Sequence, residues 1–222
     1  MTCKNLNIYS WKNYNKSIVK IAKKNIQYNN NHHINSIEHS YYPHTRDMFS
    51  ISITETKIKT ILDYGSNISS LSNIINKIET KSKKFLIFDP FKFKNKIKIK
   101  KINYKIINDI KKIQKEKINF IHFGSCLQYI ENFKYDLKKI NYKKCLKILI
   151  TATPITYGKA YKTEQSNHKN LIQNVHNIYD VISFFQSVGF KLIFKSAMNI
   201  DLAKLKKINK KTYFLNILLK KK

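Results

Sequence analysis

Two short apolar runs, each ending in an aspartate, constrain the fold of this chain more than any other feature. The first run, residues 58–63, ends at Asp63 and is followed at once by Gly65 and a turn of small residues that opens a helical pattern. The second run, residues 84–89, ends at Asp89. Each run is typical of a buried parallel strand whose carboxylate emerges at the C-terminal end. In α/β proteins such a turn lets the backbone approach a nucleoside-containing cofactor, and the later acid can bind ribose hydroxyls.

Apolar strand patterns and helical patterns alternate from residue 58 onward, which predicts an α/β protein with a mostly parallel sheet and helices on both faces. The last two strands lack a clear crossover helix between them, so the final strand is expected to insert antiparallel. We expect seven strands, over 58–63, 84–89, 102–107, 118–123, 146–152, 190–195 and 212–219, and helices over 67–79, 109–116, 127–139 and 171–188.

The first part of the chain, 1–57, is expected to be a helical and loop extension or lid before a main domain at 58–222. Trp11, Tyr14 and Ile18 fall near one face of a weak helical pattern, and a polar stretch rich in asparagine and histidine follows at 29–39.

Size and composition fit a globular protein, with 222 residues of which 42% are hydrophobic. No apolar run reaches the roughly 20 residues that a transmembrane helix needs. The start of the chain lacks the apolar segment of a secretory signal, so we expect a cytoplasmic protein.

The formal net charge of +30 comes almost entirely from lysine, since Arg46 is the only arginine. Such a charge is typical of proteins that bind nucleic acid or another polyanion. Proteins that read phosphates and bases favour arginine, however, and a bias toward AT-rich codons would also explain the excess of Lys, Ile and Asn. The sequence therefore leaves a nucleic-acid partner open without favouring it.

Neither a disulfide framework nor a metal site is predicted. Cys3, Cys126 and Cys145 show no CxxC spacing. Four further candidate ligands cluster in a polar segment, where solvated loop residues are expected rather than metal ligands: His32, His33, His39 and His44.

The strand order and the acid-tipped first two strands resemble the class I S-adenosylmethionine-dependent methyltransferases, over about residues 58–219. The resemblance implies a Rossmann-like sheet and S-adenosylmethionine as cofactor. In that family the first turn reads as an acid followed by alternating glycines. Here Asp63 and Gly65 match, whereas Asn67 and Ser69 replace the next two glycines. Asparagine is the best substitute where φ must be positive, and serine is small, so this turn remains compatible with a cofactor.

The resemblance assigns the cofactor to residues at the carboxyl ends of four strands. Asp89 matches the acid that binds the ribose, Pro90 and Phe91 would lie against the adenine, and Asp109 matches a contact to the adenine amino group. For each acid alone, a helix N-cap or a solvated loop is the alternative. The full implied cofactor set is Asp63, Gly65, Ser66, Asn67, Asp89, Pro90, Phe91, Asp109, Ile110, Gly124, Ser125 and Gln128.

A second block, 118–130, resembles the fourth strand and turn of small-molecule methyltransferases. Asn119 stands where an acid is usual, and Leu127-Gln128-Tyr129 resembles a motif of a bacterial methyltransferase group with no assigned substrate. The run Thr153-Pro154 and the later Thr163-Glu164-Gln165 resemble the same group.

Methyl transfer needs mainly an aligned nucleophile and removal of any proton on it, so sequence specifies catalytic residues poorly. We assign no catalytic residue. His122 is as compatible with a packed core histidine as with a base, and Cys126 is expected to be a buried thiol. The candidates near the carboxyl ends of strands four and five are His122, Ser125, Thr153, Tyr157, Gln165 and His168.

The sequence favours a methyltransferase that acts on oxygen or nitrogen of a small-molecule or saccharide acceptor. A methyltransferase-like binding or scaffold domain without activity, for instance for a polyanion, is the alternative. A nicotinamide-dependent oxidoreductase is less favoured, because only one glycine of the dinucleotide fingerprint is present. The amino-methylation motif of nucleic-acid methyltransferases is absent after the fourth strand. The sequence gives no oligomeric state.

Overall fold

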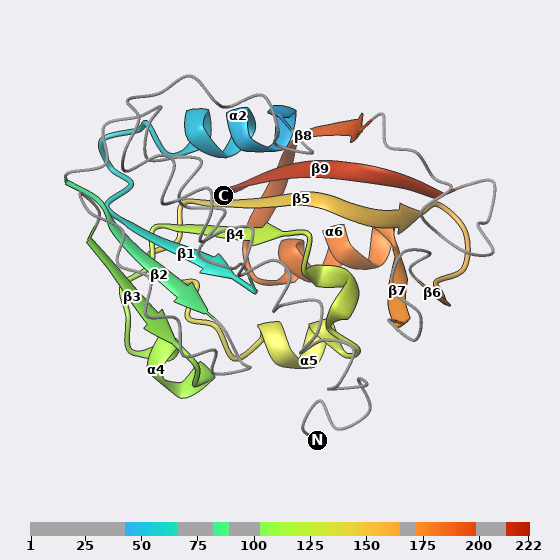
Figure 1. Cartoon of the computed structure of the whole chain (residues 1–222), viewed down its shortest axis with the longest axis horizontal. Helices are drawn as coiled ribbons and strands as arrows, with labels where there is room; N and C mark the ends of the chain where they lie inside the picture. Colours follow the sequence, from blue (N-terminus) through green and yellow to red (C-terminus); the bar gives the residue numbers. More distant parts are fainter. Residues whose placement is uncertain (1–42, 66–81, 89–102, 165–171, 199–211) are drawn as a thin grey trace, which may run out of the picture.

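The computed structural model describes residues 43–65, 82–88, 103–164, 172–198 and 212–222, and these ranges form a three-layer α/β structure built on one sheet (Figure 1). The expected helix over 67–79 and most of the expected N-terminal extension lie outside the described residues.

Five parallel strands form the first part of the sheet, in the order β3-β2-β1-β4-β5. The apolar runs of β1, β2, β4 and β5 are buried on both faces, which explains why they read as continuous hydrophobic segments, whereas the edge strand β3 is largely exposed. The strands are β1 (Thr60–Tyr64), β2 (Lys84–Phe88), β3 (Asn103–Ile107), β4 (Phe120–Gly124) and β5 (Lys147–Thr156).

The antiparallel end of the sheet follows β5. Strand β9 (Thr212–Lys221) pairs antiparallel with β5 and with β8 (Phe190–Met198), and therefore lies between them. This arrangement confirms the predicted final antiparallel strand.

An antiparallel hairpin that the sequence patterns did not predict joins the same sheet. It consists of β6 (Tyr161–Glu164) and β7 (Ile172–Asn177), and β7 pairs parallel with the carboxyl end of β5. The expected helix over 171–188 is therefore wrong in its first turns. The observed helix, α6 (Ile178–Ser187), begins only after Asn177, whose side chain caps α6 by accepting from the amides of Tyr179 and Asp180.

The expected helix over 127–139 is also divided in two. A 3-10 turn, η1 (Leu127–Tyr129), ends at Ile130, which has extended backbone angles. Helix α5 (Phe133–Leu137) then starts anew at Asn132, whose side chain accepts from the amide of Tyr135. The weak helical pattern over 109–116 forms α4 (Ile110–Gln114).

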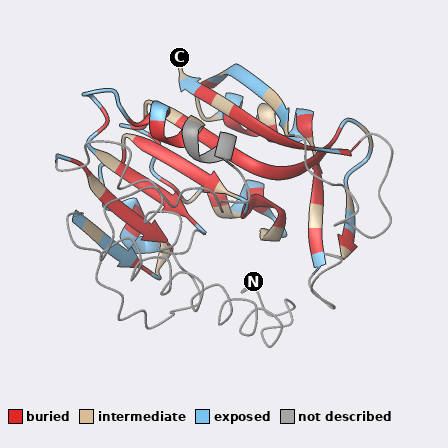
Figure 2. Ribbon diagram, turned by 45° about the horizontal axis from the view of Figure 1, so that its top comes forward, coloured by how far each residue is buried: buried red, intermediate tan, exposed pale blue. Residues whose placement is uncertain are grey.

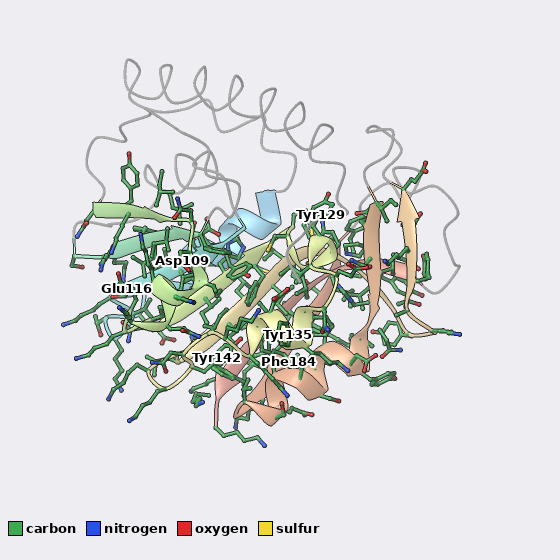
Figure 3. The ribbon with its side chains drawn as sticks, turned by 90° about the horizontal axis from the view of Figure 1, so that it is seen from below. Asp109, Glu116, Tyr129, Tyr135, Tyr142 and Phe184 are labelled. Carbon is green, nitrogen blue, oxygen red and sulfur yellow. The ribbon has the colours of Figure 1, made fainter. Side chains whose placement is uncertain are left out.

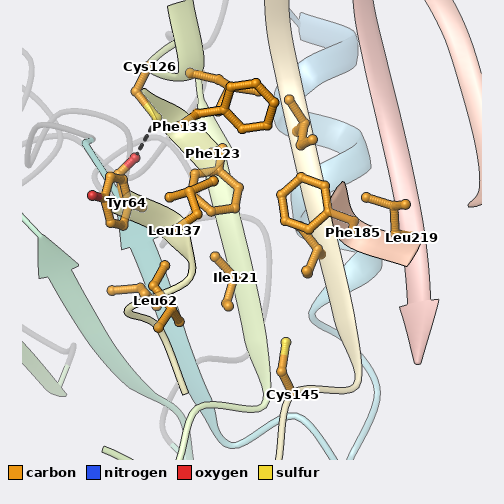
Figure 4. Close-up of a cluster of buried hydrophobic side chains, with 14 of the residues drawn as sticks. Leu62, Tyr64, Ile121, Phe123, Cys126, Phe133, Leu137, Cys145, Phe185 and Leu219 are labelled. Carbon is orange, nitrogen blue, oxygen red and sulfur yellow. Dashed lines mark hydrogen bonds between the residues drawn. The ribbon is translucent and has the colours of Figure 1, made fainter. Parts of the chain in front are cut away.

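Two apolar clusters lie on opposite faces of the sheet. Figure 2 shows how much of the sheet is buried, and Figure 4 shows part of the larger cluster. Helices α4, α5 and α6 cover one face, with Ile113, Phe133 and Phe185 in that cluster. Helix α2 (Pro43–Ser52) covers the other face through Phe49 and, just after its end, Ile53. Although α2 falls within the expected N-terminal extension, it supplies part of the core. None of the described helices is long and apolar enough to span a bilayer.

Candidate functional site

The carboxyl ends of the parallel strands bring several of the predicted residues to one edge of the sheet. Tyr64 of β1 pairs with Phe88 of β2 and with Phe123 of β4, so Gly65, directly after β1, and Gly124, the last residue of β4, lie at neighbouring strand ends. Strands β1 and β4 are also where the strand order reverses. In open α/β sheets, ligands bind at this point. The predicted residues Ser66, Asn67, Asp89, Pro90 and Phe91 lie outside the described residues, as do Gln165 and His168.

A buried polar triad crosses three neighbouring strands at this edge. His122 of β4 bonds through Nδ1 to Oδ1 of Asp63, at 2.9 Å, and through Nε2 to Oγ1 of Thr151, at 2.8 Å. All three side chains are buried. Because a carboxylate only accepts, Nδ1–H donates to Asp63, while Nε2 and the hydroxyl of Thr151 share a hydrogen bond in which either atom can be the donor. The triad therefore fixes the orientation of the Asp63 carboxylate.

The second carboxylate oxygen of the triad has no partner among the described residues. Within that part of the chain, Oδ2 of Asp63 is buried and forms no hydrogen bond, and the same is true of Oε1 of Gln128. An unpaired buried acceptor costs about 1–3 kcal/mol, and more when it is charged. Two such acceptors next to the switch point of the sheet are what a ligand with N–H or O–H donors would satisfy.

The imidazole of His122 packs against two further residues. Phe49 of α2 stacks on it, with ring centroids 4.5 Å apart. Gly124 also packs against the ring, since a Cβ added at this glycine would lie 2.6 Å from Cε1 of His122. Position 124 therefore has to be glycine because of the histidine ring.

Two non-glycine residues next to the triad have positive φ angles, which are uncommon for such residues. They are Ser125, at 51°, and Ala152, at 50°. The amide of Ser125 donates to the carbonyl of Thr151, and the β5–β9 register shifts between Ile150 and Thr153. Such backbone strain persists only where the surrounding structure holds it, and it is concentrated at functional sites.

The bulge in β5 is held from the neighbouring strand. The buried side chain of Asn216, on β9, accepts through Oδ1 from the amide of Ala152 at 3.1 Å. Thr153 is buried, and its hydroxyl donates to the carbonyl of Thr151. Thr153 therefore supports the bulge and does not present its hydroxyl at the surface.

Gly65 has a φ of 71°, as the sequence reading of this turn expects. Its Cα lies against Cys126, because a Cβ at position 65 would be 2.6 Å from Cβ of Cys126. The thiol of Cys126 donates to the carbonyl of Tyr64 (Figure 4). Burial, together with the nearby charge of Asp63, raises the pKa of Cys126 well above its usual value. The prediction of a buried thiol at this position is confirmed.

The turn η1 is fixed to the unexpected hairpin. Nε2 of Gln128 donates to Oγ of Ser125, while the carbonyl of Gln128 accepts from Nδ2 of Asn174. His176 donates from Nε2 to the carbonyl of Leu127, and burial lowers the pKa of this histidine. Strand β7 thereby sets the position of Gln128 and its unpaired oxygen.

The other predicted residues lie further from the triad. Asp109 (labelled in Figure 3) caps α4 by accepting from the amide of Lys111, which is the helix N-cap alternative that the sequence left open for this acid. Ile110 packs against the core. Asn119 is at the opposite edge of the sheet, where its Oδ1 accepts from the amides of Lys59 and Thr60. Tyr157 follows β5 and is partly exposed.

Sequence patterns missed Phe49, Thr151, Asn174, His176 and Asn216. Each acts through a contact between segments far apart in the chain, so no local spacing marks it. The only available signal was for Thr151, a threonine in an otherwise apolar run that ends at the same edge as Asp63.

No protein-family model matches the chain, and no curated protein matches its sequence. Solved structures do share its architecture. The 1,6-didemethyltoxoflavin-N1-methyltransferase of Burkholderia thailandensis, with S-adenosylhomocysteine bound, is similar at 8% identity with a TM-score of 0.54, over 94% of this chain and 89% of that one.

Two further structures are similar. Magnesium protoporphyrin IX methyltransferase of Synechocystis PCC 6803, with S-adenosylmethionine bound, has 9% identity and a TM-score of 0.54, over 86% of each chain. The N-terminal domain of EvdMO1, with S-adenosylhomocysteine and D-fucose, has 8% identity and a TM-score of 0.53, over 94% of this chain and 97% of that one. This chain therefore has the Rossmann-like α/β fold of the class I methyltransferases.

Proposed function

We propose that this protein is an S-adenosylmethionine-dependent methyltransferase. The observation that carries the proposal is the unpaired Oδ2 of Asp63, buried at the switch point of this fold. The ammonium group of the methionine part of the cofactor is a donor of the kind that this carboxylate lacks. The unpaired oxygen of Gln128 offers a second acceptor for the same ligand.

The described residues that would hold the cofactor are Asp63, Gly65, Gly124, Ser125 and Gln128. When bound, the cofactor supplies an electrophilic methyl group on a sulfonium. His122 and Thr151 keep the carboxylate of Asp63 in one orientation, and Phe49 closes the side of the ring that faces α2. Because these side chains are already ordered, little conformational entropy is lost on binding.

The acceptor that we propose is a small molecule or a saccharide, methylated on nitrogen or oxygen. The similar structures support this, since they include an enzyme named for N1-methylation of a small heterocycle and a domain crystallised in the presence of D-fucose. We assign no catalytic base, because neither Thr153 nor Cys126 presents a free proton acceptor: the first is hydrogen-bonded within β5, and the second holds its proton.

Calorimetric titration of the whole protein with S-adenosylmethionine and S-adenosylhomocysteine tests the proposal, with NADH as the comparison ligand. We expect micromolar binding of the first two alone. The variant Asp63→Asn keeps the bond to His122 but replaces Oδ2 by a donor, so it should weaken binding by roughly tenfold or more. Asp136→Asn is the matched control, because that aspartate forms only an ion pair with Lys139 at the surface.

The variant Asp89→Ala tests the predicted ribose contact. If Asp89 binds the ribose, this variant should lower the affinity for both S-adenosylmethionine and S-adenosylhomocysteine. Equal affinity of Asp63→Asn and the wild type would show that the unpaired oxygen does not face the cofactor. Binding of NADH instead would favour the oxidoreductase.

The second candidate function is a binding domain without activity. Asn67 and Ser69 in place of two glycines, together with the net charge of +30, favour it. A folded protein that binds none of the three nucleotides would move this alternative to first place.

A further inference from the structure

Three tyrosines from three different elements meet at the surface beside a lysine. The ring of Tyr157 lies 6.2 Å from that of Tyr179 and 5.8 Å from that of Tyr213, with interplanar angles of 74° and 79°. Nζ of Lys195 donates to the Tyr157 hydroxyl at 2.9 Å and lies 5.0 Å from the centre of its ring. We refer to these four residues as the tyrosine patch.

The rings of the tyrosine patch are far from fully covered. Tyr179 is 62% exposed, Tyr213 42% and Tyr157 36%. Isolated exposed apolar residues need no explanation, but side chains that gather from separate elements into one patch mark a binding surface. The edge-to-face contacts fix the rings in place while leaving ring surface open to solvent, so a flat group could stack there at little entropic cost.

The position of the patch favours a long ligand. Gly124 is level with Thr151 in the sheet, and Tyr157 follows the end of β5. The chain from Thr151 to Tyr157 rises by about 3.3 Å per residue along β5. The tyrosine patch therefore lies up to roughly 20 Å beyond Gly124, at the carboxyl end of β4. A small acceptor held at the candidate site would not reach it, whereas a polymer with repeated flat groups can use several rings at once.

The charge of the molecule defines the chemistry of that polymer. The acidic residues Glu55, Glu116, Glu131, Asp136 and Asp180 each form an ion pair with a lysine, and the whole chain has a net charge of +30. Lys195 is not among the lysines of these pairs in the described part of the chain. A polyanion is therefore attracted to the protein as a whole, and Lys195 supplies a cation at the tyrosine patch.

We propose that the tyrosine patch binds single-stranded nucleic acid by base stacking on its tyrosines, with Lys195 contacting the phosphate backbone. Exposed aromatic rings within a positively charged surface are the two components of sequence-independent single-strand binding. The chain has one arginine, so it lacks the bidentate donors that read bases, and the binding should tolerate any sequence. This proposal does not depend on methyl transfer and does not require the nucleic acid to be the acceptor.

Fluorescence anisotropy of the whole protein with labelled oligothymidylate and oligouridylate of about 12 nucleotides tests the proposal. Inorganic polyphosphate, which has the charge but no bases, is the comparison ligand. We expect Tyr157→Ala and Tyr179→Ala each to weaken binding of both oligonucleotides by about tenfold. Their affinity for polyphosphate should stay unchanged, and Tyr157→Phe should bind as the wild type does.

Tyr135→Ala is the matched control. Tyr135 is 57% exposed on α5 (Figure 3) and also has a lysine over its ring, Lys139 at 4.0 Å, but it belongs to no tyrosine cluster among the described residues. This variant should bind oligonucleotides normally. An unchanged affinity in both patch variants would overturn the proposal, as would an equal loss for polyphosphate or an equal effect of Tyr135→Ala. Tyr179 is the most exposed of the three tyrosines, so Tyr179→Ala is expected to fold. If Tyr157→Ala does not fold, Tyr179→Ala still tests the proposal.

Discussion

Gly124 packs so closely against His122 on β4 that no side chain fits at position 124: an added Cβ would be 2.6 Å from Cε1 of the imidazole. The ring cannot retreat, since it is bonded at both nitrogens and stacked on Phe49. The two residues therefore determine one another, although the sequence left His122 open between a packed core histidine and a base and placed Gly124 in a cofactor turn.

Gly124→Ala should therefore lower the free energy of unfolding by about 1–3 kcal/mol through overpacking. In a His122→Ala background the same substitution should cost much less, because the ring it collides with is gone. Chemical denaturation of the four proteins gives the coupling energy. Additive costs would mean that the ring and the glycine do not meet.

Gly65→Ala combines a positive φ with a collision against Cys126, so we expect a loss of stability of about 2–4 kcal/mol. Gly158→Ala is the control, because a Cβ there would meet only Oγ1 of Thr156 at an ordinary 3.6 Å. Thermal unfolding should separate the two variants clearly. Similar melting temperatures would contradict the described backbone of the turn.

His176 should make stability depend on pH. Burial lowers its pKa in the folded state below 6.5, although the charge of Asp180 acts in the opposite direction. As the pH falls below about 6.5, His176 is therefore protonated in the unfolded chain before it is protonated in the folded protein. This difference lowers the free energy of unfolding by up to about 1.4 kcal/mol per pH unit. Stability from this group is complete above about pH 6.5 and is lost below it, until the folded-state pKa is reached.

His176→Gln keeps an N–H donor for the carbonyl of Leu127 but cannot titrate in this range. Unfolding curves from about pH 7 to pH 5 should therefore be less steep with pH for the variant than for the wild type. The opposite order would mean that the folded protein prefers the charged imidazole.

Asn216→Ala should destabilise the protein by about 1–3 kcal/mol, because it leaves the buried amide of Ala152 without an acceptor. Asn141 offers a control, since its Oδ1 accepts from the amide of Lys143 at the exposed surface, where water can replace it. Asn141→Ala should therefore have a small effect in the same denaturation experiment. Comparable losses in both variants would argue against the bulge described for β5.

The thiols of Cys126 and Cys145 should resist alkylation in the folded protein at about pH 8, because the thiolate is the reactive form. Burial raises the pKa of Cys145 to about 12 and that of Cys126 well above its usual value. Mass spectrometry after a short reaction should find both unmodified, and both modified after addition of denaturant. Rapid labelling of Cys126 in the native protein would show that this side of Gly65 opens to solvent.

The central parallel strands could be predicted from the sequence because strands buried on both faces are continuous apolar runs, and here polar turns separate them. The β6–β7 hairpin could not. Ile172, Val175 and Ile178 are spaced as on a helix and run directly into α6, so the pattern extends the helix by two turns. Pairing with the end of β5, a non-local interaction, decides the strand instead.

The candidate site was predictable only where its chemistry is local. Asp63, Gly65 and Gly124 stand at the ends of recognisable strands, and the turn that follows β1 requires a residue such as glycine. His122 was ambiguous, because its partners Thr151 and Phe49 come from β5 and α2 and meet it only after the sheet has formed. The unpaired oxygen of Asp63 is likewise a property of packing and cannot be read from the residue type.

The place of β9 has a consequence for synthesis on the ribosome. Among the described strands, β8 pairs only with β9, which also covers one edge of β5 and is made later than both. Until residues 212–221 have emerged, the nascent chain carries an open edge on β5 and an unpaired β8. Open edges of this kind pair with other chains. Translation that pauses before β9 therefore lengthens the time for which these edges can pair with other chains.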